Sequence, residues 1–165
     1  RDAGAEELIA VPHWGKEYKR APENSTVDYA KKMAKAGFDV IIGGHPHMVQ
    51  PIEWLTVETE TGEHTALVAW SLGNFIDNMK IQYTDSGIIL DFTIVEAYGG
   101  GFDIVDVGYV PVYCWRRDNN IQALCSGEYL NERPEGMDDA TYDRMKASHR
   151  ELVELIGDGF ILLDN

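Results

Sequence analysis

The pattern of apolar residues near the start of the chain constrains the fold more than any other feature. The run LIAV at residues 8–11 is short and apolar and predicts a strand. A helix is predicted next, with Ser25 or Thr26 as its N-terminal cap and Gly37 as its stop. The apolar run FDVII follows directly at residues 38–42. Strand, helix and strand in this order predict a βαβ unit with two parallel strands.

Beyond residue 50 the sequence predicts antiparallel strands and then one closing helix. Apolar runs are separated by glycine or asparagine, as in β-hairpins. The last apolar pattern has helical spacing and places Met145, Leu152 and Ile156 on one face. We therefore expect an α/β fold, with α+β character toward the C-terminus, in a single domain. The turns are predicted at Thr61-Gly62, Gly99–Gly101 and Asn119-Asn120, and the closing helix at 138–156.

The net charge narrows the class of partner. The chain has 28 acidic and 14 basic residues, which gives −14 at neutral pH. Nucleic acids and anionic membrane surfaces bind basic footprints, so we expect no nucleic-acid partner and no anionic membrane surface. An acidic protein that acts on an anionic substrate needs a local positive charge, and a bound metal ion is one source of it.

Three of the five histidines follow the two strands of the predicted βαβ unit. His13 comes after the first strand, and His45 and His47 bracket a proline after the second. The carboxyl ends of neighbouring parallel strands lie at one edge of a sheet, so we expect these imidazoles to share one rim. Imidazole nitrogen binds Zn, Mn or Fe, and the pattern therefore indicates a metal cluster. Glu17 could orient a ligand or serve in acid–base chemistry.

Structural interpretations of the same residues stay open at this point. His13 can simply pack beside its tryptophan neighbour, the HPH turn can be a loop, and Glu17 can be solvated. The motif SLGNF is either a tight turn or the carrier of a functional Asn74. His149 lies on the apolar face of the closing helix and is interpreted as a packing residue. No Asp or Glu lies in the HPH turn, whereas two-metal hydrolases need carboxylates.

The two cysteines, Cys114 and Cys125, fit no zinc-binding spacing. They are either a disulfide or two ordinary thiols. A two-residue turn at Asn119-Asn120 would place Cys114 opposite Cys125 in an antiparallel pair, which is within disulfide range.

The motifs HWGKEY, AGFDVIIGGHPHMVQPIE and ALVAWSLGNFI, in this order, resemble the bacterial poly-gamma-glutamate capsule biosynthesis (CapA-type) family of the calcineurin-like metallophosphoesterase superfamily. The resemblance is specific over roughly residues 5–80 and looser beyond. It implies a two-sheet sandwich flanked by helices, with a dinuclear site for divalent metal ions (Mn, Fe or Zn). The implied metal ligands are His13, His45 and His47. The implied catalytic residues are Glu17 and Asn74.

The family's other metal ligands come from N-terminal motifs carrying Asp and an Asn-His pair, and this chain has no match for them. The resemblance therefore implies that residues 1–165 are the C-terminal part of the domain, with the missing N-terminal half of the same domain as a partner. In the full-length protein it implies metal-assisted hydrolysis of a phosphate ester or a related bond, at the bacterial cell envelope or outside the cell. Alone, the chain is expected to be inactive, to bind metal weakly if at all, and either to self-associate or to be less stable than its length suggests.

Two competing classes stay open. One is a non-catalytic envelope protein that binds or exports an anionic capsule polymer. The other is a structural domain whose histidines bind nothing. A phosphatase assay on the full-length protein, with and without chelator, distinguishes the polymer-binding protein from an enzyme. Metal analysis of the chain tests whether the histidines bind an ion.

Overall fold

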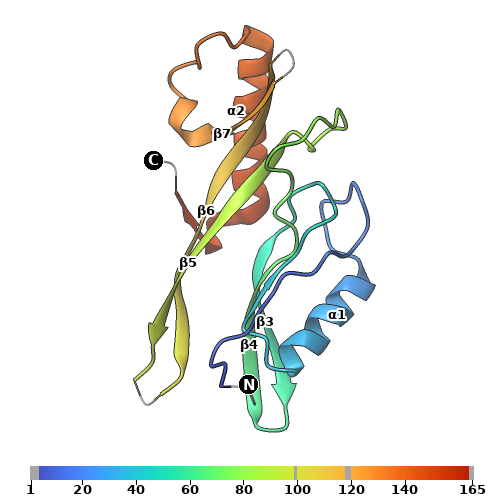
Figure 1. The fold of residues 1–165 in the computed structure, drawn as a ribbon, viewed down its shortest axis with the longest axis vertical. Coiled ribbons are helices and arrows are strands. Elements are labelled where there is room, and N and C mark those ends of the chain that lie inside the picture. The colour runs from blue at the N-terminus through green and yellow to red at the C-terminus, as the bar shows by residue number, and fades with distance from the viewer. Residues whose placement is uncertain (1–3, 99, 118–119, 164–165) are drawn as a thin grey trace.

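The structure, a computed structural model, describes residues 4–98, 100–117 and 120–163. Two sheets and two α-helices make up this part of the chain (Figure 1). The expected mixed α/β class is confirmed. None of the helices in the described ranges has the length and apolar character to cross a membrane. In chain order the elements are β1 (Ile9–Ala10), α1 (Asn24–Lys35), β2 (Val40–Ile42), β3 (Ile52–Thr59), β4 (Gly62–Ala69), β5 (Ser86–Glu96), β6 (Phe102–Arg117), β7 (Asn120–Cys125), α2 (Asp139–Ile156) and β8 (Ile161–Leu162), with 3-10 helices at Ser126–Tyr129 and Gly157–Gly159.

The first sheet has the strand order β1-β2-β4-β3. Strand β1 is parallel to β2, with Ile9 opposite Val40, so the predicted βαβ unit is confirmed. Strand β4 is also parallel to β2, whereas β3 is antiparallel to β4. The carboxyl ends of β1, β2 and β4 therefore lie at the same edge of this sheet.

Helix α1 begins earlier than its predicted cap. Its N-cap is Glu23, whose carbonyl accepts from the Val27 amide at 3.0 Å and whose side chain makes no capping hydrogen bond. The predicted cap at Ser25 or Thr26 is therefore wrong, and Thr26 is instead buried on the inner face of the helix. The predicted stop is confirmed, since Gly37 has φ +88° and follows the last turn.

The second sheet has the order β5-β6-β7, and β8 also pairs with β6. The β5–β6 hairpin turns where the sequence predicts it, with the Ala97 amide donating to the Gly101 carbonyl. The register predicted for the next hairpin is wrong: Cys114 faces Ala123, and Cys125 faces Val112. The turn predicted at Asn119-Asn120 lies partly outside the described residues, and Asn120 itself pairs with Arg117. Both cysteines are free thiols.

Buried apolar clusters lie on both faces of the first sheet, and a further cluster lies between the second sheet and α2. On the outer face, α1 packs Ala30 against Val68 and Trp70. On the inner face, the first sheet meets the second sheet and α2, as Figure 1 shows. The apolar face predicted for α2 is confirmed, because Met145, Leu152 and Ile156 are buried. The inner cluster contains Val40, Val49, Ile52, Leu67, Ala69, Ile88, Val107, Tyr109, Leu152 and Ile156.

Candidate metal centre

Three loops meet at the carboxyl edge of the first sheet. The loop after β1 carries His13 and Glu17, the loop after β2 carries the HPH turn, and the loop after β4 carries Asn74. Since β1, β2 and β4 are parallel to one another, their loops leave the sheet at the same edge. The topology of the first sheet thus brings together segments that are distant in the sequence.

The three histidines share this rim, as the sequence predicts. The ring centroids of His13 and His45 are 4.5 Å apart, and those of His45 and His47 are 6.2 Å apart. A parallel bridge joins His13 to Gly44, with the Trp14 amide donating to the Gly44 carbonyl at 3.0 Å. This backbone pairing extends the β1–β2 ladder into the loops and fixes the spacing of the rings.

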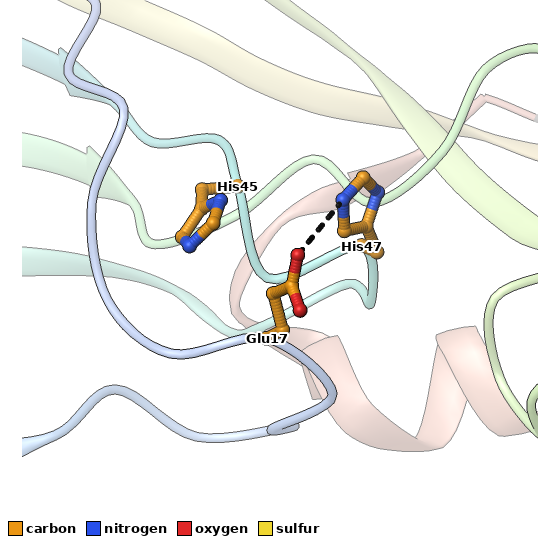
Figure 2. A group of neighbouring side chains, drawn as sticks. All are labelled: Glu17, His45 and His47. Atoms are coloured by element: carbon orange, nitrogen blue, oxygen red, sulfur yellow. Dashed lines mark ion pairs between the residues drawn. The ribbon is translucent and has the colours of Figure 1, made fainter.

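Glu17 completes a compact group of donor atoms with His45 and His47. One donor atom from each of the three side chains lies within 4.8 Å of the others. Figure 2 shows the Glu17 carboxylate between the two imidazoles, and its Oε1 lies 3.9 Å from His47 Nε2. His13 packs beside His45 but is outside this group of donors.

Asn74 determines which nitrogen of His47 carries the proton. The Asn74 Nδ2 donates to the Thr84 carbonyl at 2.9 Å, and a carbonyl can only accept. Asn74 Oδ1 therefore faces His47 Nδ1, at 2.9 Å, and accepts a hydrogen bond from the Nδ1–H. In the neutral ring this leaves the lone pair on Nε2, the nitrogen that faces Glu17. Asn74 is itself buried, so its orientation is fixed.

The HPH turn holds its histidines in an unusual backbone conformation. His45 has φ +101° and His47 has φ +59°, while the proline between them is fully buried. Non-glycine residues at such angles cost roughly 1–3 kcal/mol each and persist only where the surroundings impose them. Here the Pro46 carbonyl accepts from the Tyr18 amide at 2.9 Å, which holds the turn against the Glu17 loop.

Two residues that the sequence analysis did not select support this arrangement. Gln50 is buried, and its Nε2 donates to the carbonyls of Lys19 and Ala21 at 3.0 Å each. These bonds anchor the loop that carries Glu17. Gly43 allows Trp14 to reach the Trp70 carbonyl, to which the indole donates at 3.0 Å. Their positions beside the HPH turn are the only sequence signal for either role.

The donor set fits a single divalent cation. Imidazole nitrogen and carboxylate oxygen are common ligands of zinc, manganese and iron. The side chains of His47 and Glu17 are 27% and 46% exposed, so solvent and a substrate can reach them. Within residues 4–98, 100–117 and 120–163, no other group of three or more His, Cys, Asp or Glu residues lies this close together. The described part of the chain thus offers one carboxylate here, rather than the several that hold two ions.

Comparison with known proteins covers the segment that builds this edge. Residues 1–79 match the family described as bacterial capsule synthesis protein PGA_cap. Through these residues, which are just under half of the chain, the protein is similar to the bacterial capsule synthesis protein family. The resemblance of the sequence motifs to the CapA-type capsule biosynthesis family is thereby confirmed. All five predicted site residues lie within the matched segment of the capsule synthesis family: His13, Glu17, His45, His47 and Asn74.

Two curated relatives agree with this family. The "PGA biosynthesis protein CapA" of Bacillus subtilis (strain 168) is 27% identical over 103 residues, which are 62% of this chain and 25% of the relative. The "Capsule biosynthesis protein CapA" of Bacillus anthracis is 27% identical over 107 residues, which are 65% of this chain and 23% of the relative. The matched region thus spans about a quarter of the length of these relatives. No solved structure matches the chain.

Proposed function

We propose that this chain is part of a capsule biosynthesis protein and contributes a metal site for the hydrolysis of a phosphate ester or a related bond. The observation that carries the proposal is the compact group of Glu17, His45 and His47, in which Asn74 sets the tautomer of His47. The family match and the names of the two relatives support the capsule role. The same names favour an association with the cell envelope.

Each site residue has a distinct task in this proposal. His45 and His47 donate imidazole nitrogen, and Glu17 supplies the negative charge that a cation requires. When bound, a divalent ion supplies Lewis acidity that polarises an ester and promotes ionisation of water. Asn74 acts through His47 by keeping Nε2 free, and is therefore a positioning residue. His13 packs on His45 and restricts the orientation of that ring.

The surroundings of Glu17 favour an anionic substrate. Lys16 and Lys19 are exposed on the same loop, in a chain of net charge −14. Two cations beside a metal site attract anions to this edge of the sheet more than to the rest of the acidic surface. Phosphate esters and polyanionic polymers share this chemistry.

A non-catalytic role in binding or exporting an anionic polymer is the second candidate. It is favoured by the donor count, because the described residues place one carboxylate at the site and two-metal hydrolysis uses more. In the enzymatic proposal the remaining ligands come from another part of the same domain, which is the expected partner. The 165-residue chain alone should then be inactive and bind metal weakly.

The deciding experiment compares hydrolysis and binding by the full-length protein. We expect turnover of a phosphate ester with Mn²⁺, Fe²⁺ or Zn²⁺, its loss with chelator, and a drop of at least about a hundredfold in His45→Ala and His47→Ala. Asn78→Ala, an exposed change in the Asn74 loop, is the matched control. Metal-dependent binding of poly-gamma-glutamate without turnover would instead establish the second candidate. Chelator-sensitive turnover by the 165-residue chain alone would contradict the expected need for a further part.

A further inference from the structure

Strand β6 has an open edge along its first part. On the side away from β5, its residues 112–117 pair with β7, and Gly108 and Tyr109 pair with β8. No strand in the described parts of the chain pairs with residues 102–107 on that side. The tip of the β5–β6 hairpin projects past β8 (Figure 1). The outward backbone groups of residues 102–107 are therefore available to another strand.

A groove runs beside this open edge. Two cavities of about 330 and 360 Å³ share Trp54, Ile104 and Val105 as lining residues. Trp54 belongs to β3, so the groove lies between the first sheet and the hairpin, and its indole is 45% exposed. An exposed tryptophan facing a free strand edge offers apolar contact for alternate side chains of an added strand.

The groove is acidic. Asp103, Asp106 and Asp158 line it, all three are exposed, and none forms an ion pair or side-chain hydrogen bond with another described residue. No Lys or Arg is among the described residues that line the groove. Asp106 has φ +51° and lies at the irregularity where β5 and β6 shift register. This bulge sets the direction of the Asp106 side chain.

We propose that this groove is a docking site for an extended partner segment in which Lys or Arg alternates with apolar residues. The segment adds as a strand to residues 102–107 of β6. Its apolar side chains pack against Trp54. Its cations face Asp103, Asp106 and Asp158. Charge complementarity selects this partner. A second copy of the chain carries −14, and an anionic polymer is likewise repelled by the three carboxylates. The proposal does not depend on the metal site.

Charged residues at a strand edge also protect against aggregation, so the experiment has to separate docking from protection. The probe is a short peptide of alternating Lys and Val, added to the chain at physiological salt. The control peptide has the same sequence with an N-methyl group on every residue, which keeps the charge and removes strand pairing along both edges. Hydrogen exchange and calorimetry report on the site and on the affinity.

We expect the Lys-Val peptide to slow hydrogen exchange at residues 102–107 and the N-methylated peptide to have no such effect. Combined Asp103→Asn, Asp106→Asn and Asp158→Asn should weaken binding about tenfold. Asparagine tolerates a positive φ, so the bulge is kept at position 106. The matched control neutralises three exposed carboxylates away from the groove, as Glu23→Gln, Asp28→Asn and Glu132→Gln, and should change affinity less than threefold.

Three results would overturn the proposal. Absence of binding would mean that the carboxylates only protect the edge. Equal weakening by both sets of substitutions would mean that the peptide follows overall charge. Sedimentation that shows a dimer, with residues 102–107 already protected in the absence of peptide, would assign the edge to a second copy of the chain.

Discussion

The Nδ1 atom of His47 lies 2.9 Å from the Oδ1 atom of Asn74, across two loops that are separated by 27 residues in the sequence. Because Asn74 also donates to the Thr84 carbonyl, its amide cannot rotate without losing a bond. The contact fixes one tautomer of His47 and turns Nε2 toward Glu17. Two loops of the matched family segment, after β2 and β4, thus act on the same imidazole.

Replacing Asn74 tests this positioning role. Asn74→Leu removes the acceptor, frees the other tautomer and should weaken Zn²⁺ affinity by about 10–100-fold, as measured by competition with a chelating indicator. Asn74→Asp keeps the acceptor for His47 Nδ1 but loses the bond donated to the Thr84 carbonyl, so it should retain more affinity than Asn74→Leu without reaching that of the unchanged protein. Asn78→Leu, an exposed change in the same loop, should have little effect. Equal affinities in Asn74→Leu and Asn74→Asp would show that the tautomer does not matter.

Gly43 and Gly44 are adjacent, but replacement by alanine should destabilise the fold strongly at Gly43 and only weakly at Gly44. A Cβ at Gly43 would lie 2.1 Å from the Trp70 carbonyl oxygen and 2.3 Å from Trp14 Nε1, whereas a Cβ at Gly44 meets no atom of the described residues within 4 Å. We expect Gly43→Ala to lower the free energy of unfolding by roughly 3 kcal/mol and Gly44→Ala to change it by less than about 1 kcal/mol. Urea denaturation of the two variants measures the difference. Similar midpoints would mean that the Trp14–Trp70 contact is readily rearranged.

The ion pair between Arg144 and Asp85 should hold α2 against the second sheet. Arg144 Nε lies 2.7 Å from Asp85 Oδ2 and Nη2 lies 3.0 Å from Oδ1, while the Asp85 side chain is only 12% exposed. Arg144→Met leaves a nearly buried carboxylate without its partner and should cost roughly 3 kcal/mol. Lys146→Met breaks the exposed pair with Asp143 on the same helix and should cost less than about 1 kcal/mol. Thermal or urea unfolding that ranks them the other way would contradict this assignment.

The two thiols should be free and differ in reactivity. Cys114 is buried, and its Sγ donates weakly to the carbonyls of Asn74 and Phe75. Burial raises the pKa of Cys114 to about 11, so little thiolate exists at pH 8. We expect a disulfide-exchange reagent to modify the partly exposed Cys125 first and Cys114 only on unfolding. Fewer than two titratable thiols after unfolding would point to an oxidised pair.

Tyr113 should make the fold sensitive to alkaline pH. Burial, followed by the nearby Asp85 carboxylate, raises the pKa of Tyr113 to about 12 from a usual value of 10.0. The unfolded chain then loses the phenol proton first, so the free energy of unfolding falls as pH rises through 10 toward 12, by at most about 1.4 kcal/mol per pH unit. Tyr113→Phe should flatten this slope in urea denaturation between pH 9 and pH 11. An unchanged slope would assign the alkaline loss to other groups.

Much of the local structure follows from the sequence because local rules specify it. The apolar runs of β1 and β2, the stop at Gly37 and the apolar face of α2 are each encoded by neighbouring residues. The rim of histidines follows as well, since two parallel strands with histidines at their carboxyl ends have only one edge at which to place them. His149 is likewise a packing residue, buried and bonded to Ser126.

Errors arise where several weak local signals compete. Ser25 and Thr26 are good caps by residue type, but the Glu23 carbonyl already accepts the first helical bond. The Cys114–Cys125 register fails because one residue of uncertainty in a turn shifts every pair along β6 and β7. Turn position alone therefore cannot assign a disulfide.

The sequence by itself determined the βαβ unit, the positions of the candidate ligands and the family of residues 1–79, because these depend on residue type and order. Only the tertiary structure decided that Glu17 joins His45 and His47, that Asn74 sets a tautomer and that Gln50 anchors the loop. These contacts join loops that are brought together by sheet topology and burial. No local periodicity in the chain encodes distances between side chains so far apart in sequence.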